Sequence, residues 1–195
     1  MPKKLQRTNR SDNSKTVMNR VRIVGGDMRS RVLSFPDAKG LRPTPDRVRE
    51  TLFNWLGQTL YGKTCLDLFA GSGALGFEAA SRGAEQVIMV ETDHQVCRAL
   101  QENLGKLGCT NVFVHCQDGL EFVSRDTQQY DVIFLDPPFD SDYLPGLLEM
   151  LPQHLSDEGM LYLESGEAID ISPPWESAKF GRAGQVYYQL LRYQA

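Results

Sequence analysis

Hydrophobic and polar positions alternate with two different periods along this chain, and the alternation predicts an α/β fold. From residue 63 onward, short apolar runs rich in β-branched residues are followed by stretches whose apolar residues lie three and four positions apart. The clearest helical stretch places Val96, Ala99, Leu100, Leu104 and Leu107 on one face. Strands that alternate with helices in this way favour a parallel sheet covered by helices.

The predicted elements cover the chain from residue 63 to its end. We expect strands over residues 65–69, 86–91, 112–115, 131–135, 160–164, 175–180 and 186–192, and helices over 74–82, 95–107, 120–125 and 144–151. No helix-length segment separates the last two strands. This predicts an antiparallel C-terminal hairpin on a mostly parallel sheet.

The N-terminal part follows a different pattern. Residues 1–18 are polar, and we expect them to be disordered. Residues 21–24 and 31–35 are β-type runs on either side of Gly25-Gly26, which predicts a small hairpin with exposed arginines. The helical pattern that follows the hairpin places Arg49 on its polar face.

Charge is distributed unevenly along the chain. Residues 1–49 carry thirteen Lys or Arg and four Asp, a net charge of +9, whereas the remaining residues carry −13, for a total of −4. A basic N-terminal part on an acidic body indicates a polyanionic partner that is met by one face only. For residues 1–18, a solvated tail without a partner would explain the charge equally well.

The cysteines and the apolar runs exclude several classes of protein. No CxxC pair and no metal-ligand spacing with histidine is found among Cys65, Cys97, Cys109 and Cys116. We therefore expect reduced, unpaired thiols and no metal site. No apolar run is long enough for a membrane span, and the N-terminus lacks the pattern of a signal peptide, so we expect a cytoplasmic protein.

A glycine-rich turn follows the first strand of the predicted sheet. The stretch from Gly71 to Gly76 matches G-x-G-x-x-G, and Glu91 lies twenty residues after Gly71. This spacing also fits a dinucleotide site, but Asp67 beside the turn would repel a pyrophosphate and favour a cationic ligand. S-adenosylmethionine carries an ammonium and a sulfonium and has no phosphate, so we expect it to be the cofactor.

Two further acids follow predicted strands. Glu91 is placed to accept hydrogen bonds from the ribose hydroxyls of the cofactor. Asp118 could accept one from the adenine amino group, or it could cap the helix that begins beside it. The residues expected to bind the cofactor from these motifs are Asp67, Phe69, Ala70, Gly71, Ser72, Gly73, Glu91 and Asp118.

The most specific motif is Asp136-Pro137-Pro138-Phe139, which ends the apolar strand over residues 131–135. An amino nitrogen on a nucleic-acid base is a poor nucleophile because its lone pair is delocalised into the ring. Asp136 and the Pro137 carbonyl could accept its two hydrogens and direct the lone pair at the methyl group, while the two prolines hold the backbone rigid. Phe139 offers a face on which an extruded base can stack. These four residues predict the catalytic centre of an amino-methyltransferase acting on nucleic acid.

The order of these motifs resembles that of the class I S-adenosylmethionine-dependent methyltransferases. Residues 40–56, with the sequence GLRPTPDRVRETLFNWL, are similar to a segment of the bacterial 16S ribosomal RNA guanine-N2 methyltransferase D family. Residues 21–26 and 184–191 also resemble the start and the end of that family. The resemblance therefore extends over nearly the whole chain after the polar tail.

The resemblance implies a Rossmann-like class I methyltransferase, α/β in class. Its seven-stranded, mostly parallel sheet would carry an antiparallel C-terminal hairpin and a small N-terminal β-hairpin extension. The implied reaction is methyl transfer from S-adenosylmethionine to N2 of one guanine in the 16S ribosomal RNA of the small subunit. The chain would divide into a basic tail (residues 1–18), an RNA-binding extension (19–41) and a methyltransferase domain (42–195).

The same resemblance adds residues that the motifs do not include. Thr44 would help to hold the methionine end of the cofactor, although it could instead cap the following helix. Contacts with the RNA backbone are expected from Arg22, Arg29, Arg31, Arg42 and Arg47.

Three other functions remain open from the residues. An adenine-N6 methyltransferase acting on DNA or RNA uses the same Asp-Pro-Pro-aromatic motif. A nicotinamide-dependent oxidoreductase would use the glycine-rich turn, and a non-catalytic RNA-binding assembly factor would keep the fold as a scaffold. A complete sheet with an antiparallel edge favours a monomer.

Overall fold

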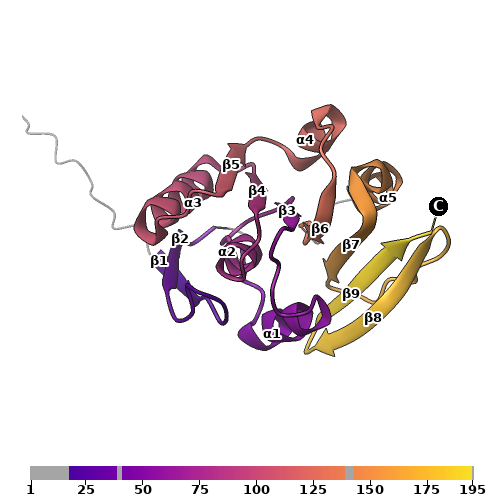
Figure 1. The fold of residues 1–195 in the computed structure, drawn as a ribbon, viewed down its shortest axis with the longest axis horizontal. Helices are drawn as coiled ribbons and strands as arrows, with labels where there is room; N and C mark the ends of the chain where they lie inside the picture. Colours follow the sequence, from indigo (N-terminus) through magenta and orange to yellow (C-terminus); the bar gives the residue numbers. More distant parts are fainter. Residues whose placement is uncertain (1–17, 39–40, 139–142, 195) are drawn as a thin grey trace, which may run out of the picture.

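The computed structural model describes residues 18–38, 41–138 and 143–194, in which helices cover both faces of a seven-stranded sheet (Figure 1). Its strands, in spatial order, are β5 (Val112–Cys116), β4 (Gln86–Glu91), β3 (Thr64–Asp67), β6 (Tyr130–Leu135), β7 (Leu155–Ser165), β9 (Val186–Tyr193) and β8 (Trp175–Ala183). Strands β3 to β7 are parallel, and β9 is antiparallel to both of its neighbours. The predicted fold class and the C-terminal hairpin are confirmed. Most of the predicted tail, residues 1–17, lies outside the described residues.

The helices divide between the two faces of the sheet (Figure 1). One face carries α1 (Asp46–Trp55), α2 (Ala74–Ser81) and α3 (His94–Leu107), and the other carries α4 (Gly119–Arg125) and α5 (Tyr143–Met150), which continues into the 3-10 helix η1 (Leu151–His154). In β6, Val132 and Phe134 enter the first core while Ile133 and Leu135 enter the second. Both faces of this strand are buried, as its continuous apolar sequence predicts. Within the described ranges, no helix combines the length and apolar content that crossing a membrane requires.

The N-terminal hairpin is confirmed, but its loop differs from the prediction. Strands β1 (Met18–Arg22) and β2 (Val32–Pro36) pair in an antiparallel two-stranded sheet. Gly25-Gly26 is not a tight turn between them, because it docks on the end of α2. The Ser81 hydroxyl donates to the Gly25 carbonyl at 2.6 Å, and the Asp27 N–H donates to the Ser81 carbonyl at 2.7 Å. A side chain at Gly26, which has a φ of 72°, would collide with that carbonyl oxygen.

The hairpin shares its hydrophobic core with the large sheet. Its inward side chains belong to the core under α1 and α2; they are Val21, Ile23, Leu33 and Phe35. Asn103 on α3 donates to the Ser34 carbonyl at 3.0 Å and accepts from the Ser34 N–H at 3.2 Å. The hairpin is therefore packed on the body of the protein, while its assignment as an RNA-binding extension stays a prediction.

A buried group of opposite charges, which we call the paired cluster, joins the hairpin to α1 and α2. It consists of Arg49, Glu78 and Arg82. The Glu78 carboxylate accepts from Arg49 at 3.0 Å, from Arg82 at 2.9 Å and from the backbone N–H of Val24 at 2.8 Å. The predicted position of Arg49 on a polar helix face is wrong, because this side chain has no exposed surface. Its buried carboxylate partner comes from a helix 29 residues away.

Candidate active site

An acid stands at the carboxyl end of each of the five parallel strands. These residues are Asp67 at the end of β3, Glu91 at the end of β4, Asp118 after β5, Asp136 after β6 and Glu164 near the end of β7. Because the carboxyl ends of parallel strands meet at one edge of the sheet, this edge is the expected ligand site of the fold. Four of the five acids were predicted. Glu164 was not, although it follows an apolar run in the same way as the others.

Two of the acids fix the glycine-rich turn. The buried Asp67 accepts the backbone N–H of Gly76 at 2.9 Å. Glu91 accepts the N–H of Gly71 at 2.9 Å through one oxygen and that of Asp93 at 2.8 Å through the other. Gly73 has a φ of 76° and stands at the start of α2, where a side chain would be strained. The turn is therefore held closed by the acids that were predicted to bind the cofactor.

The other predicted cofactor residues lie in the same turn. The Ala70 N–H donates to the backbone of β4 at 2.8 Å, and the Ser72 hydroxyl accepts the N–H of Ala74 at 3.3 Å. Phe69 stacks on Tyr143 with ring centroids 6.0 Å apart. The predicted set is thus brought together in space, and its role toward a cofactor stays a prediction.

Asp118 performs the second of its two predicted roles. It is the N-cap of α4, where its carboxylate accepts the Glu121 N–H at 3.0 Å. A capping carboxylate retains further lone pairs, so a contact with the cofactor stays a prediction.

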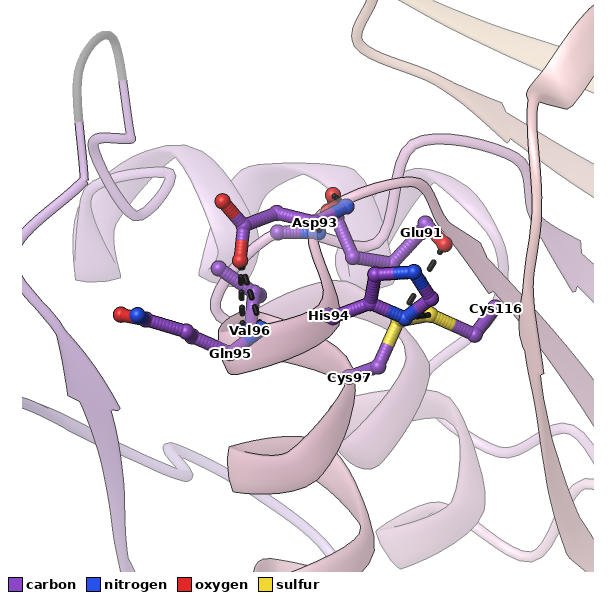
Figure 2. The surroundings of a disulfide bond; sticks show 8 residues. Glu91, Asp93, His94, Gln95, Val96, Cys97 and Cys116 are labelled. Atoms are coloured by element: carbon purple, nitrogen blue, oxygen red, sulfur yellow. Dashed lines mark hydrogen bonds between the residues drawn. A yellow bond between two sulfur atoms is a disulfide. The ribbon is translucent and has the colours of Figure 1, made fainter.

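A disulfide between Cys97 and Cys116 joins the first turn of α3 to the carboxyl end of β5 (Figure 2). This corrects the expectation of unpaired thiols, which rested on spacing along the chain alone. Cys97 lies in the first turn of α3 and Cys116 at the end of β5, and their Cα atoms are 5.9 Å apart, within the range that a disulfide spans. The bond lies beside Glu91, and His94 Nδ1 lies 3.2 Å from the Cys116 sulfur (Figure 2).

Thr44 is joined to the newly found acid. Its buried hydroxyl donates to Glu164 at 3.1 Å, and the Tyr162 hydroxyl donates to the same carboxylate oxygen at 2.9 Å. Thr44 does not cap α1, because Pro45 holds the N-cap position and no side chain caps this helix. The bond between Thr44 and Glu164 spans 120 residues, which places the segment before α1 against the end of β7.

Three of the edge acids form what we call the acidic cluster: Asp67, Asp136 and Glu164. Because side chains alternate along a strand, all three project to the face that α1 and α2 cover. Burial raises the pKa of Asp67 to about 7, against the opposing effect of the Gly76 N–H. Burial and the charges of Glu164 and Asp67 raise the pKa of Asp136 well above its usual range. Burial also raises the pKa of Glu164, although the Tyr162 and Thr44 hydroxyls oppose the shift.

The acidic cluster has a charge that the described protein does not balance. In that part of the chain, no Lys or Arg forms an ion pair with any of its three members. Like charges buried together favour the binding of a cation or of hydrogen-bond donors. The residues present therefore fit a cationic cofactor such as S-adenosylmethionine.

The predicted catalytic motif lies beside this cluster. Asp136 is half-buried, Pro137 is buried and Pro138 is exposed. Phe139 lies outside the described residues, so its predicted contact with a base stays a prediction. The motif stands between the glycine-rich turn of β3 and the carboxyl end of β7, since β6 lies between those two strands.

The five arginines predicted to contact RNA are all exposed, and two have partners in the protein. Arg22 forms an ion pair with Asp46 at 3.0 Å, and Arg31 donates to the Lys106 carbonyl at 2.9 Å. The other three are Arg29, Arg42 and Arg47, whose guanidinium groups have no partner in the described part of the protein.

Comparisons with known proteins agree with this architecture. A family model described as "Conserved hypothetical protein 95" matches residues 21–192. A protein of Escherichia coli named "Ribosomal RNA small subunit methyltransferase D" is 40% identical over 180 residues, which cover 90% of this chain and 91% of that protein. The chain belongs to the ribosomal RNA small subunit methyltransferase D family. A Bacillus subtilis relative named "Putative rRNA methyltransferase YlbH" is 33% identical and covers 77% of this chain and 85% of its own length.

Solved structures extend the family likeness to three dimensions. A structure titled "Putative methyltransferase yhhF" from Escherichia coli has a TM-score of 0.81 and 39% identity, covering 91% of this chain and 99% of that one. A putative methylase from Haemophilus influenzae has a TM-score of 0.76 and 37% identity, with 91% and 100% covered. The family fold therefore includes the edge of the sheet at which the five acids meet.

Proposed function

We propose that this protein transfers a methyl group from S-adenosylmethionine to the exocyclic N2 of a guanine in the 16S ribosomal RNA of the small subunit. The observation that carries the proposal is the position of Asp136 and Pro137 at the end of β6, inside a cluster of unbalanced negative charge. The names of the 40% identical relatives support the RNA substrate. The choice of guanine N2 rests on the family resemblance of residues 40–56.

The chain's own residues would perform two tasks toward the cofactor. Glu91 and the glycine-rich turn would hold the adenosine part of the cofactor, and Asp67 would favour its cationic end. When bound, S-adenosylmethionine supplies a methyl group on a positively charged sulfur. Asp136 and Pro137 would hold the base nitrogen to receive this methyl group, and the electron pair of the broken carbon–sulfur bond would stay on sulfur.

Asp136 would act on the base nitrogen both before and during methyl transfer. Before transfer, its carboxylate accepts one amino hydrogen and so directs the nitrogen lone pair at the methyl group. During transfer the nitrogen becomes more acidic, and the same carboxylate oxygen takes the proton that it loses. The raised pKa of Asp136 makes it a stronger base than a solvated aspartate, which suits this role.

The test is methyl transfer to small ribosomal subunits from a strain that lacks this gene, followed by digestion of the RNA to nucleosides. We expect N2-methylguanosine from the wild-type protein and none from Asp136→Ala, which should still bind S-adenosylmethionine in calorimetry. N6-methyladenosine as the product would contradict the choice of base. Tight binding of NADH, or full transfer by Asp136→Ala, would contradict the mechanism.

A further inference from the structure

Glu164 is a buried acid that none of the predicted motifs contains. Its side chain is 4% exposed, yet it carries a carboxylate at the edge of the sheet where the catalytic motif lies. The hydroxyls of Thr44 and Tyr162 both donate to one oxygen, Oε2, at 3.1 and 2.9 Å. Two donors on one oxygen hold the carboxylate in a single orientation and stabilise it in a buried position.

The second oxygen of Glu164 is left open. Among the described residues, no group donates to Oε1. In the described chain, His154 Nε2 is the one fully buried side-chain nitrogen or oxygen that lacks a hydrogen-bond partner. Glu164 Oε1 lacks a partner as well, but it is not fully buried. This oxygen therefore faces space that a ligand can reach. The residue therefore presents an oriented acceptor to whatever binds there.

The register of the sheet places this acceptor beside the catalytic acid. Leu135 on β6 pairs with Leu163 on β7, and the next residues along these parallel strands are Asp136 and Glu164. Neighbouring strands lie about 4.8 Å apart, so the two carboxylates form a pair of adjacent acceptors. A ligand that matches them carries two hydrogen-bond donors side by side.

Guanine has such a pair of donors, and adenine does not. The amino group at C2 of guanine is adjacent to a protonated ring nitrogen, N1–H. The amino group at C6 of adenine is adjacent to an N1 that carries a lone pair, which a carboxylate repels.

We propose that Glu164 is the specificity-determining residue of this site: its Oε1 accepts the N1–H of the target guanine while Asp136 accepts the N2 amino hydrogen. This inference rests on the proposed function and extends it to the choice between guanine and adenine. Glu164 makes and breaks no covalent bond in this role. Thr44 and Tyr162 act through it, as positioning residues.

The competing ligand for Glu164 is the ammonium of the cofactor, and the strand order favours the base. The turn and the strand-end acids expected to bind the cofactor lie on β5, β4 and β3, whereas Glu164 lies on β7, on the far side of β6. Thr44, which the resemblance assigns to the methionine end of the cofactor, is the one predicted cofactor residue that contacts Glu164, and its hydroxyl hydrogen is used in that bond. Asp67, on β3 itself, is the acid of the cluster nearest to the glycine-rich turn. The base must reach Asp136 on β6, which is the direct neighbour of β7.

The first experiment compares Glu164→Gln with the wild-type protein and with Glu167→Gln, an exposed acid near the same strand end. We measure kcat/KM for small subunits from the gene-deletion strain, the Kd for S-adenosylmethionine, and the methylated nucleosides. We expect Glu164→Gln to lower kcat/KM by about 10- to 100-fold without changing the cofactor Kd. Glu167→Gln should match the wild type. An unchanged kcat/KM, or a loss matched by an equally weaker cofactor Kd, would overturn the inference.

The second experiment changes the base. An RNA fragment of the small subunit is made with 2-aminopurine at the methylated guanine, which keeps the amino group at C2, replaces N1–H by a lone pair and lacks the O6 carbonyl. The wild-type protein should methylate it about 10- to 100-fold more slowly than guanine. Glu164→Gln should show no such preference, because its amide can donate to N1. A preference that persists in Glu164→Gln would assign the discrimination to another residue.

Two further measurements test the inference if Glu164→Gln does not fold, and separate its failure from a failure of the proposed function. Tyr162→Phe retains the carboxylate and removes one orienting hydroxyl, so it should lower kcat/KM without changing the cofactor Kd even if Glu164→Gln does not fold. Unchanged kcat/KM in Tyr162→Phe would then count against the inference. A wild-type product other than N2-methylguanosine would instead contradict the proposed function itself, which the nucleoside analysis reports separately.

Discussion

The paired cluster and the acidic cluster both lie under helices α1 and α2, and they balance their buried charges in opposite ways. In the paired cluster, Glu78 is surrounded by two guanidinium groups and a backbone N–H within 3.0 Å. In the acidic cluster, three carboxylates share one region, and the pKa of Asp67 and that of Asp136 are both raised. Buried charges that have partners in the protein are compatible with a stable fold. Buried charges without such partners favour the binding of a ligand that supplies the missing opposite charge or hydrogen-bond donors. Buried charge alone therefore does not identify a ligand site; what distinguishes the two clusters is whether the buried charge has partners within the protein.

Neutralising the acidic cluster should separate activity from stability. We expect Asp136→Asn to lower methyl transfer by about 10²- to 10⁴-fold, since the amide cannot accept the proton from the nitrogen. The melting temperature should stay the same or rise, because one of the three like charges of the acidic cluster is removed. Transfer assays and thermal unfolding of the same preparation test both parts. A large fall in melting temperature would mean that the acidic cluster also holds the fold together.

Breaking the paired cluster should do the reverse. Glu78→Gln removes the buried carboxylate that Arg49 and Arg82 share and leaves Arg49 with only the partly exposed Asp46 as a charged partner, at 2.6 Å. We expect the free energy of unfolding to fall by about 3–5 kcal/mol. The matched control is Arg125→Ala, which removes an exposed ion pair with Glu121 of 2.8 Å and should cost less than about 1 kcal/mol. Urea unfolding measures both. Equal losses in the two variants would remove the distinction between buried and exposed pairs.

The pKa of Asp67 predicts how cofactor binding depends on pH. A carboxyl with a raised pKa of about 7 is mostly protonated at pH 6 and mostly charged at pH 8, and its charged form favours a cation. The affinity for S-adenosylmethionine should therefore rise about tenfold from pH 6 to pH 8. Calorimetry at several pH values tests this. Asp67→Asn corrects for titration of the cofactor's own groups, and an identical pH dependence in that variant would contradict the assignment.

Exposed arginines should show the smallest effect, and only toward RNA. The guanidinium groups of Arg42 and Arg47 have no protein partner in the described part of the chain, unlike that of Arg49 in the paired cluster. Replacing both by alanine should weaken RNA binding and lower the slope of log affinity against log salt by about 1 for each arginine. Arg192→Ala, an exposed arginine at the end of β9, is the control. A slope unchanged in the double variant would place the RNA elsewhere.

The parts of the molecule that the sequence predicts well are those governed by local pattern. The alternation of strands and helices located every strand of the sheet, and acids after apolar runs located Asp67, Glu91, Asp118 and Asp136. The strand predicted over residues 160–164 begins at Leu155 in the structure. The prediction started too late because Asp157, Glu158 and Gly159 interrupt the apolar pattern.

The features that sequence reasoning missed depend on partners far along the chain. Arg49 is buried because Glu78 lies beside it, and Thr44 meets Glu164 across 120 residues. The disulfide likewise joins two cysteines whose spacing matches no known motif, because β5 returns the chain to the edge of the sheet at which α3 begins. Periodicity reports which face of an element is buried and does not report what it is buried against.

The docking of the N-terminal hairpin determines when its conformational entropy is lost. Its backbone donates to Glu78, accepts from Arg49 and exchanges two hydrogen bonds with Asn103, so it is ordered by three helices at once. A flexible arm would lose about 1–2 kcal/mol of backbone entropy for each residue that RNA orders. The hairpin loses that entropy when the protein folds. In the proposed complex, the backbone that carries the hairpin arginines would therefore meet the RNA already ordered. The cost of ordering that backbone would lower the free energy of unfolding of the protein and would not reduce its affinity for RNA.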